Sequence, residues 1–270
     1  GFSDIYGTKT FKYRLFETNL AIQNDIPVII LPQTLGPFKE NSNYLVAESV
    51  LKYAKKVYVR DEQFASDLNN MNVEFELTKD LSFYMEIEEF QYEIDEKAVG
   101  LNVSGLCYSN KFRDLSGEFD HYKLLISRII KYFQEENVKI YLLAHSYNYL
   151  NPESDYSNDD MLAIREVYNG LLDKTNVYLI DENLNSPQTK YIISRFKFFI
   201  GTRMHANFAA IFKNVPVFGL AYSYKYEGSF KYMGLQDHYA NVRDIEENEI
   251  ESIVNKIKEK YIEVSKSVLE

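Results

Sequence analysis

The sequence has no tryptophan, a single cysteine and no long apolar run, and each absence excludes a class of protein. With Cys107 alone, the chain can form neither an intrachain disulfide nor a cysteine-based zinc site, which fits a reducing cytosol. No apolar stretch approaches the roughly 18 residues of a membrane span, and no signal peptide is evident. We therefore expect a cytoplasmic protein without a transmembrane segment. Attachment to the inner face of a membrane stays open.

Positive charge is also scarce, because 30 Lys and Arg residues stand against 40 Asp and Glu, a net charge of -10. Nucleic-acid binding needs a basic face, so we do not expect it. The chain lacks a glycine-rich dinucleotide fingerprint, a phosphate loop ending in Gly-Lys-Ser/Thr and a His-Glu-x-x-His zinc motif. Neither a metal nor another cofactor is therefore expected, and an anionic substrate would need a few locally placed cations.

Apolar runs alternate with helix-period segments through most of the 270 residues. Strands that read as continuous apolar runs separated by helices indicate parallel sheets covered on both faces. At roughly 100 to 200 residues per domain, the length allows two domains. The sequence therefore predicts an α/β protein with two Rossmann-like domains, and the runs that carry this prediction are "PVIILPQ", "KVYVRD", "VGLNVSG", "KIYLLAHS", "NVYLID", "FFIGTR" and "VPVFGLAY".

Domain boundaries follow from the acidic segment "MEIEEFQYEIDEKA", residues 85–98, which has no convincing period and is interpreted as the interdomain connection. We expect a partial N-terminal domain at 1–90, a C-terminal domain at 91–245 and a C-terminal helix at 246–270. The chain opens on Gly1 rather than Met, so an N-terminal portion is expected to be missing. Helices are expected near 9–23, 42–54, 62–70, 119–135, 158–172, from Ser186 as N-cap onward, 205–212 and 246–264.

Polar side chains follow several predicted strands at their carboxyl ends. In open parallel sheets ligands bind there, because loops converge and helix N-termini present unpaired N–H groups. We expect these side chains to face one interdomain cleft. The candidates are Arg60 after "VYV", Asn102 and Ser104 in "VGLNVS", His145 after "YLLA", Arg203 and His205 after "FFIGT", and Lys225 beyond "VFGLAYSY".

The strand-to-helix turn "IGTRMHANFA", residues 200–209, is the most informative of these junctions. Arg203 offers a planar fork of donors that suits phosphate or carboxylate, while His205 titrates near neutrality and can transfer a proton. Small residues behind them let the helix approach the sheet closely. The turn therefore predicts an anion site with a proton donor.

The other candidates each have a structural alternative, which the sequence leaves open. Arg60 could form a surface ion pair with Asp61, and His145 could hydrogen-bond a backbone carbonyl in a buried turn. Asn102 and Ser104 could cap a turn instead of binding substrate. Lys225 could be a solvated lysine.

Taken in order, the segments resemble the polysaccharide pyruvyl transferase family over residues 31–228. "GFSD" at the start also resembles the tail of a glycine-rich turn that members carry after about a quarter of their length. The last matching segment is the most specific, and the order of the others adds weight. The matching pieces are "LPQTLGPF", "VYVRDEQFASDL", "TKDLSFYM", "VGLNVS", "YLLAHS" and "FFIGTRMHANFAAIFKNVPVFGLAYSYKYEG".

The resemblance implies a GT-B-like fold and transfer of a pyruvyl group from phosphoenolpyruvate to two hydroxyls of a sugar, as a cyclic ketal in surface or exopolysaccharide biosynthesis. It implies that Arg60 and Arg203 bind the phosphate and carboxylate, and that His205 is the general acid. Asn102, Ser104 and His145 remain candidate substrate-binding residues. Lys225 matches a family lysine in a "YDxK"-like stretch that reads "YSYK" here, with Ser223 and Tyr224 in place of the common Asp-Pro.

Two other functions stay open beside this one. A GT-B glycosyltransferase with a nucleotide-sugar donor would share the fold, and a non-catalytic glycan-binding relative could use the 23 tyrosines as stacking platforms. The acceptor is a sugar or oligosaccharide whose identity, linkage and lipid attachment the sequence does not reveal. Homo-oligomer formation is compatible with the sequence.

Overall fold

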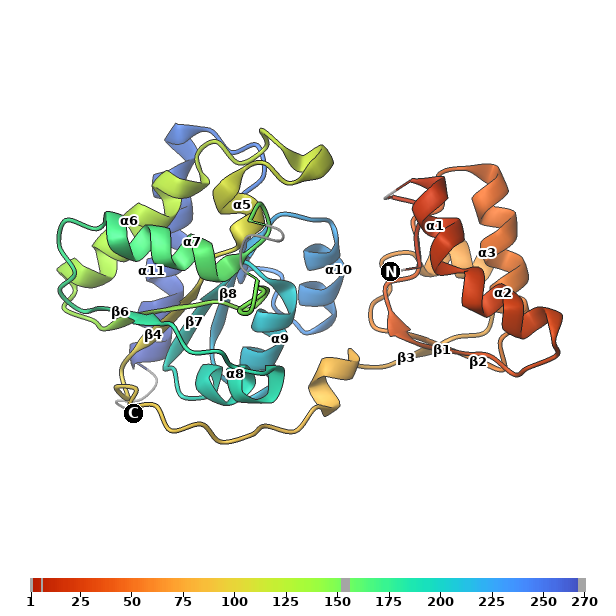
Figure 1. Cartoon of the computed structure of the whole chain (residues 1–270), viewed down its shortest axis with the longest axis horizontal. Coiled ribbons are helices and arrows are strands. Elements are labelled where there is room, and N and C mark those ends of the chain that lie inside the picture. The colour runs from red at the N-terminus through yellow and green to blue at the C-terminus, as the bar shows by residue number, and fades with distance from the viewer. Residues whose placement is uncertain (1, 6, 152–155, 267–270) are drawn as a thin grey trace. The chain divides into compact units, whose positions relative to one another are not determined.

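The chain divides into two compact units (Figure 1). Unit 1 comprises residues 1–84 together with 227–236, and unit 2 comprises residues 85–226 together with 237–270. The computed structural model describes residues 2–5, 7–151 and 156–266. The first boundary lies at Met85, a few residues before the predicted one at 91, and the C-terminal helix belongs to unit 2.

Unit 1 is built on a three-stranded parallel sheet in the order β1-β2-β3. The helix predicted over 9–23 is two helices, because the chain turns at Leu15, which is buried together with Phe11. The elements are α1 (Thr8–Arg14), α2 (Phe16–Gln23), β1 (Ile29–Gln33), α3 (Asn41–Tyr53), β2 (Lys56–Val59), α4 (Ala65–Asn70), β3 (Glu76–Leu77) and the 3-10 helix η1 (Leu81–Tyr84).

The start of α3 is held by a carboxylate from far earlier in the chain. Asp4 accepts hydrogen bonds from the backbone N–H groups of Lys39 and Glu40, both at 3.0 Å, and from Asn43 Nδ2 at 3.1 Å. Burial works to raise the pKa of Asp4, but these bonds outweigh it and lower the pKa below the ordinary value. The carboxylate thus satisfies N–H groups that the helix itself leaves unpaired.

Unit 2 is built on a six-stranded parallel sheet in the order β6-β5-β4-β7-β8-β9. Its strands are β4 (Val99–Asn102), β5 (Ile140–Leu143), β6 (Val177–Ile180), β7 (Phe198–Gly201), β8 (Val217–Ala221) and β9 (Tyr239–Asn241). Numbered along the chain within this unit, the order reads 3-2-1-4-5-6, which is that of Rossmann sheets. The predicted α/β fold with parallel sheets is therefore confirmed.

Helices lie between the successive strands of unit 2 and after its last strand (Figure 1). They are α5 (Gly105–Ser109), η2 (Arg113–Leu115), α6 (Tyr122–Glu135), α7 (Asp160–Gly170), α8 (Ser186–Ile193), α9 (Met204–Phe212), η4 (Glu247–Glu249) and α11 (Ile250–Lys266). The helix α10 (Lys225–Tyr232), between β8 and β9, begins in unit 2, and its residues from 227 onward belong to unit 1. The N-cap of α8 is Asn185, one residue before the predicted Ser186, and its side chain forms a capping box with Gln188. None of the described helices is long and apolar enough to span a membrane.

Strand residues of unit 2 alternate between two faces of the sheet. Val99 and Leu101 of β4 share one core with Ile140 and Leu142 of β5 and with buried residues of α6, α7 and α11. On β4 itself, Gly100 points the other way, and a Cβ there would lie only 2.4 Å from the Phe196 ring. A mainly aliphatic core therefore covers the first face, and the Phe196 ring packs closely against β4 on the second.

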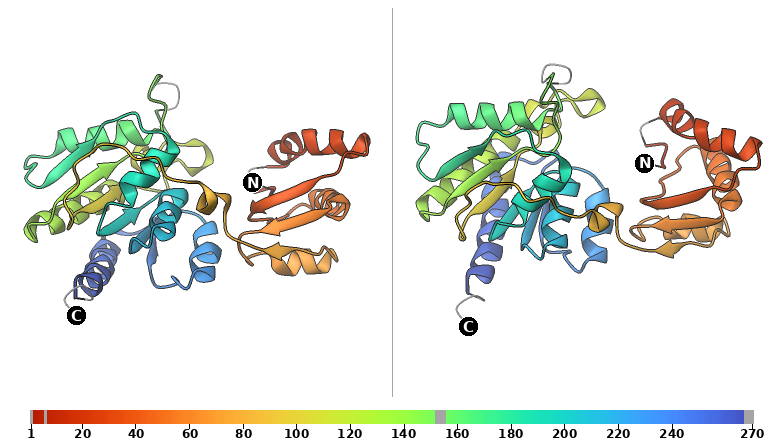
Figure 2. Two further views of the ribbon diagram at one scale, coloured as in Figure 1. Left: turned by 90° about the horizontal axis from the view of Figure 1, so that it is seen from below. Right: turned by 60° about the horizontal axis from the view of Figure 1, so that its bottom comes forward.

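Residues 85–97 contain no helix or strand and run over unit 2 as an extended chain (Figure 2). This connecting segment is fixed along its length: Lys190 Nζ donates to the Met85 carbonyl at 2.6 Å, and Gln188 Nε2 donates to Glu88 Oε1 at 2.7 Å. Tyr92 Oη donates to the Leu179 carbonyl at 3.4 Å. The segment predicted as a connection is thus also a covering layer of unit 2.

The Asp4 contacts predict how unit 1 responds to a truncation. Asp4→Ala leaves two backbone N–H groups and one amide without their acceptor, so amide hydrogen exchange in α3 and β1 should report a stability loss of about 2 kcal/mol. The partly exposed Asp67→Ala is the matched control and should change exchange by less than about 0.5 kcal/mol. Equal effects from both substitutions would contradict the capping role.

Because the pKa of Asp4 is lowered by folding, its contribution is complete above the unfolded pKa and is lost as pH falls through the folded one. The exchange difference between the wild type and Asp4→Ala should accordingly shrink in acid.

Candidate functional site

The strand order of unit 2 reverses between β4 and β7, which are paired in parallel. Ligands of open α/β sheets bind at such a switch point, outside the carboxyl ends of the strands. The turns that leave these two strands are Val103 to Gly105 and Thr202 to Arg203. Two of the residues predicted from the sequence, Ser104 and Arg203, therefore lie in turns where this fold is expected to bind a ligand.

Asp160, at the first position of α7, is the centre of this region. Its carboxylate is fully buried and accepts hydrogen bonds from the backbone N–H of Gly105 at 2.7 Å, of His145 at 3.2 Å and of Ser146 at 3.0 Å. It also accepts from Asn102 Nδ2 at 3.3 Å. One carboxylate thus ties together the loops that follow β4 and β5.

Arg203 completes this arrangement as the ion-pair partner of Asp160. Arg203 Nη2 lies 2.6 Å and Nε lies 3.0 Å from Asp160 Oδ1, and Nη2 also donates to the Asn158 carbonyl at 3.0 Å. Burial works to lower the pKa of Arg203, but the charge and hydrogen bonds of Asp160 raise it above the ordinary value. We name Asp160, Arg203 and Asn102 the Asp160 cluster.

Asn102 and Ser104 lie in the interior of unit 2, and each side chain is fully buried. Asn102 Nδ2 donates to the Leu143 carbonyl at 3.1 Å, and its Oδ1 accepts from the backbone N–H of Arg203 at 2.8 Å. Ser104 occupies the N-cap position of α5. Asn102 thus helps to shape the turns at this edge of the sheet, and the contact of both residues with substrate stays a prediction.

Two buried tyrosines brace the turn after β7. Tyr122 Oη lies 2.6 Å from Thr202 Oγ1 and accepts from the backbone N–H of Ser104 at 3.1 Å. Tyr226 Oη donates to the Thr202 carbonyl. Burial raises the pKa of both phenols, so both stay protonated at neutral pH and keep their hydroxyl hydrogens for these bonds.

His205 begins the exposed side of α9, whose first residues are Met204 and His205. Its ring meets Phe208 edge to face, with centroids 5.7 Å apart. His145 lies near enough for the two imidazoles to affect each other: burial lowers the pKa of His145 to about 4, Asp160 works to raise it, and His205 and Arg203 lower it further. His145 is therefore neutral at physiological pH.

Lys225 lies farther along the same edge of the sheet, after β8, and it begins α10. The side chain is partly buried, and Nζ lies 6.0 Å from the centroid of the Tyr224 ring. The departure from the family pattern in "YSYK" thus falls at the start of a helix that the sequence did not predict.

Arg60 lies in unit 1, where it forms a comparable cluster at the carboxyl ends of β1 to β3. Arg60 Nη1 lies 2.7 Å from Asp80 Oδ2, and Nε donates to Thr34 Oγ1 at 3.1 Å. Thr34 Oγ1 in turn donates to Asp61 Oδ2 at 2.5 Å. The predicted pair with Asp61 is present at 3.6 Å, but it is buried rather than on the surface.

Sequence reasoning missed Asp160, Tyr122 and Tyr226. The stretch "NDDML" carries two adjacent aspartates at a helix start, and Asp159 caps α7 through the N–H of Leu162, as such a residue commonly does. Because a helix needs only one N-cap residue, the second aspartate, Asp160, was the feature of the sequence that could have indicated another role. No cluster of three His, Cys, Asp or Glu side chains suited to a metal ion occurs among the described residues.

A family model, described as polysaccharide pyruvyl transferase, matches residues 1–224. The chain belongs to the polysaccharide pyruvyl transferase family. The match covers both strand-to-helix turns at the switch point and the Arg60 cluster of unit 1. No curated protein matches this member of the family.

Solved structures similar to this pyruvyl transferase family member include three whose titles name UDP-GlcNAc or UDP. UDP-GlcNAc 2-epimerase of Methanocaldococcus jannaschii has a TM-score of 0.55 at 11% identity, with 89% of this chain and 65% of that chain covered. The Neisseria meningitidis UDP-GlcNAc 2-epimerase bound to UDP-GlcNAc gives 0.52 at 14%, covering 90% and 66%. S. aureus MnaA with UDP gives 0.54 at 14%, covering 91% and 63%.

At this identity the likeness establishes the fold alone, which is GT-B-like. The chain spans about two thirds or slightly less of the length of these structures, 63% to 66%. The polysaccharide pyruvyl transferase family and the GT-B-like fold predicted from the sequence are thereby confirmed.

Close packing at Gly105 predicts a sharp test of the Asp160 cluster. A Cβ at residue 105 would lie 2.2 Å from the Asp159 carbonyl oxygen, which is rigid backbone, so Gly105→Ala must push α7 and the β4 loop apart. We expect the free energy of unfolding in urea to fall by about 3 kcal/mol. Gly170→Ala, where a Cβ meets no atom within 4 Å, is the control and should change it by less than about 1 kcal/mol.

The lowered pKa of His145 predicts an acid-dependent loss of stability. Between the ordinary pKa of 6.5 and the folded value of about 4, the unfolded state binds more protons, so stability is complete above pH 6.5 and falls as the pH drops toward 4. The loss should reach about 2 kcal/mol and be smaller in His145→Gln. Denaturant unfolding between pH 4 and 7, with an NMR titration of the imidazoles, measures both; a His145 that titrates near 6.5 would contradict the burial.

Proposed function

We propose that the chain transfers a pyruvyl group from phosphoenolpyruvate to two hydroxyls of one sugar residue and forms a cyclic ketal in surface or exopolysaccharide biosynthesis. The observation that supports this most is a helix start carrying an exposed histidine, His205, at the switch point of a chain that belongs to the pyruvyl transferase family. No metal or other cofactor takes part in the proposed reaction.

The proposed chemistry begins with a proton. Protonation of the methylene carbon of phosphoenolpyruvate creates an oxocarbenium-like centre at C2, to which the first sugar hydroxyl adds. The C2–O bond to phosphate then breaks, and the second hydroxyl closes the ring. The two hydroxyl protons balance the one taken up by the methylene carbon and the one that leaves with inorganic phosphate.

His205 suits the role of general acid by its position. The imidazole is exposed at the first turn of α9, where a substrate can reach it, and an imidazole is a side chain that can donate a proton in general acid catalysis. The nine-residue helix α9 also directs its N-terminal N–H groups and its dipole toward this end of the sheet. An anionic group of phosphoenolpyruvate would gain from both.

Arg203 and Arg60 are proposed to act differently from a simple pair of anion-binding arginines. Each guanidinium already pairs with a carboxylate, Asp160 and Asp80 respectively, so a bound anion must compete with or share that partner. Arg203 therefore positions the turn that carries His205, and the direct contacts to phosphate and carboxylate implied by the resemblance remain part of the proposal. Lys225 is the further cation proposed for the donor.

The acceptor is proposed to be a sugar or oligosaccharide, free or lipid-linked, and the reaction to take place in the cytoplasm, at the inner face of the membrane if the acceptor carries a lipid. These assignments follow from the family, which acts on polysaccharide by its description. A homo-oligomer is compatible with them.

A nucleotide-sugar enzyme is the second candidate, favoured by the similar structures whose titles name UDP-GlcNAc or UDP. Isothermal titration separates the two. We expect phosphoenolpyruvate to bind and UDP-GlcNAc not to bind; the opposite result would overturn the proposal in favour of a nucleotide-sugar transferase or epimerase.

The catalytic test measures phosphate released from phosphoenolpyruvate with a panel of hexosides as acceptors. His205→Ala should lower turnover by about a hundredfold or more, because the general acid is lost while its exposed position spares the fold. His121→Gln is the matched control: this second histidine precedes α6, where its Nδ1 lies 2.9 Å from the Ile245 carbonyl, and its loss should leave turnover near wild type. A His205→Ala protein with unchanged turnover would refute the assigned role.

A further inference from the structure

Near the amino ends of β5 and β6, one face of the sheet carries two tyrosines. Ile140, Leu142 and Val177 point into the core beneath α6 and α7, and the intervening Tyr141 and Tyr178 point to the other face. The two rings are stacked with centroids 4.7 Å apart and an angle of 16° between their planes. Because the rings stack, each turns one face toward the other; Tyr141 is buried, and Tyr178 on the edge strand, which is 39% exposed, supplies the accessible part of this aromatic floor.

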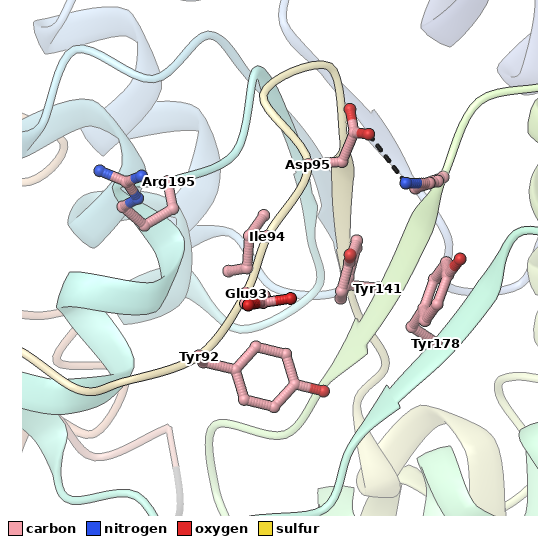
Figure 3. A pocket seen from close by; sticks show the side chains of 8 residues that line it. Tyr92, Glu93, Ile94, Asp95, Tyr141, Tyr178 and Arg195 are labelled. Atoms are coloured by element: carbon pink, nitrogen blue, oxygen red, sulfur yellow. Dashed lines mark hydrogen bonds and ion pairs between the residues drawn. The ribbon is translucent and has the colours of Figure 1, made fainter.

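The connecting segment passes over this aromatic floor, and a pocket of about 750 Å³ lies between the two (Figure 3). Tyr92 faces the ring of Tyr141 edge on, with centroids 6.4 Å apart. Arg195, which follows α8, also lines the pocket. Its lining residues are Tyr92, Glu93, Ile94, Asp95, Lys139, Tyr141, Tyr178 and Arg195.

Charges around the pocket are balanced. Lys139 Nζ and Asp95 Oδ2 form an ion pair at 2.9 Å, and Arg195 and Glu93 bring one further charge of each sign. A nucleotide or another polyanion would require an excess of positive charge, which this pocket lacks. The balance instead favours a neutral ligand with many hydroxyl groups, because charged side chains at the rim donate to and accept from hydroxyls.

The phenol groups add both an apolar surface and donors. A tyrosine ring offers a flat apolar face with a polar tip, a combination that suits a pyranose ring with its C–H face and its equatorial hydroxyls. Burial, with a contribution from Glu182, raises the pKa of Tyr92 to about 12, so the phenol is protonated at neutral pH. An apolar peptide would offer no matching partner to Glu93 and Arg195, the two charged lining residues outside the Lys139–Asp95 ion pair.

We propose that this pocket, the tyrosine pocket, binds a neutral sugar residue of a glycan. It lies at the amino ends of β5 and β6, whereas the Asp160 cluster lies at the carboxyl ends. Lys139 and His145 flank β5 on its two sides and are six residues apart along an extended strand, roughly 20 Å. The pocket is thus a second site, which holds a polymer away from the place where we propose that chemistry occurs.

The test is binding of the full chain to a glycan microarray that carries neutral and acidic saccharides. We expect neutral glycans to bind the wild type and to bind Tyr178→Ala at least about tenfold more weakly, because the exposed half of the aromatic floor is gone. Tyr232→Ala is the matched control, since Tyr232 is 41% exposed and lies outside the pocket, and it should bind like the wild type. Arg195→Met should also weaken binding.

Thermal unfolding of the same variants is the control that tests whether they are folded. Absence of any bound glycan, exclusive binding of acidic glycans or equal binding by the wild type and Tyr178→Ala would each overturn the inference. His205→Ala separates this proposal from the proposed function: it should retain glycan binding while losing phosphate release. For Tyr178→Ala we expect the opposite result with a monosaccharide as the acceptor: glycan binding is weakened, and turnover is unchanged.

Discussion

The arrangement of unit 2 depends on one buried carboxylate. Asp160 accepts hydrogen bonds from the loops after β4 and β5 and pairs with Arg203 after β7, so three segments far apart in the chain meet at a single charged group. A buried carboxylate is costly unless its charge is matched and its lone pairs are used, and here both conditions are met. The start of α9, and with it the position of His205, is set by this charge pair.

Unit 1 also contains a buried arginine–carboxylate pair that holds loops together. Arg60 pairs with Asp80, and Asp61 and Thr34 complete the hydrogen bonds at the carboxyl ends of β1 to β3. In both units, therefore, an arginine that looks available for an anion is already neutralised by a carboxylate. Such a pair holds loops in place with a directional bond, and any anion that approaches meets a guanidinium of fixed orientation with reduced net charge.

Much of the fold could be predicted from the sequence, because parallel strands buried on both faces read as continuous apolar runs, as "KIYLLA" and "FFIGT" do. The carboxyl-end rule also brought Asn102, His145 and Arg203 to one place. It could not tell a group that contacts ligand from one that holds a loop, because the partner of Arg203 lies 43 residues away. The break at Leu15 was missed for the same reason: it depends on what packs there, not on local pattern.

On β5 and β6 the two faces of the strands serve separate purposes. On one face, the hydrophobic core contains Ile140, Leu142 and Val177. On the other face, the connecting segment lies over their sequence neighbours Tyr141 and Tyr178. Tyr178 is 39% exposed, so its exchange disturbs the packing of the sheet less than exchange of a residue in the hydrophobic core. Relatives that differ there could diverge in what their outer face recognises while inheriting an unchanged framework.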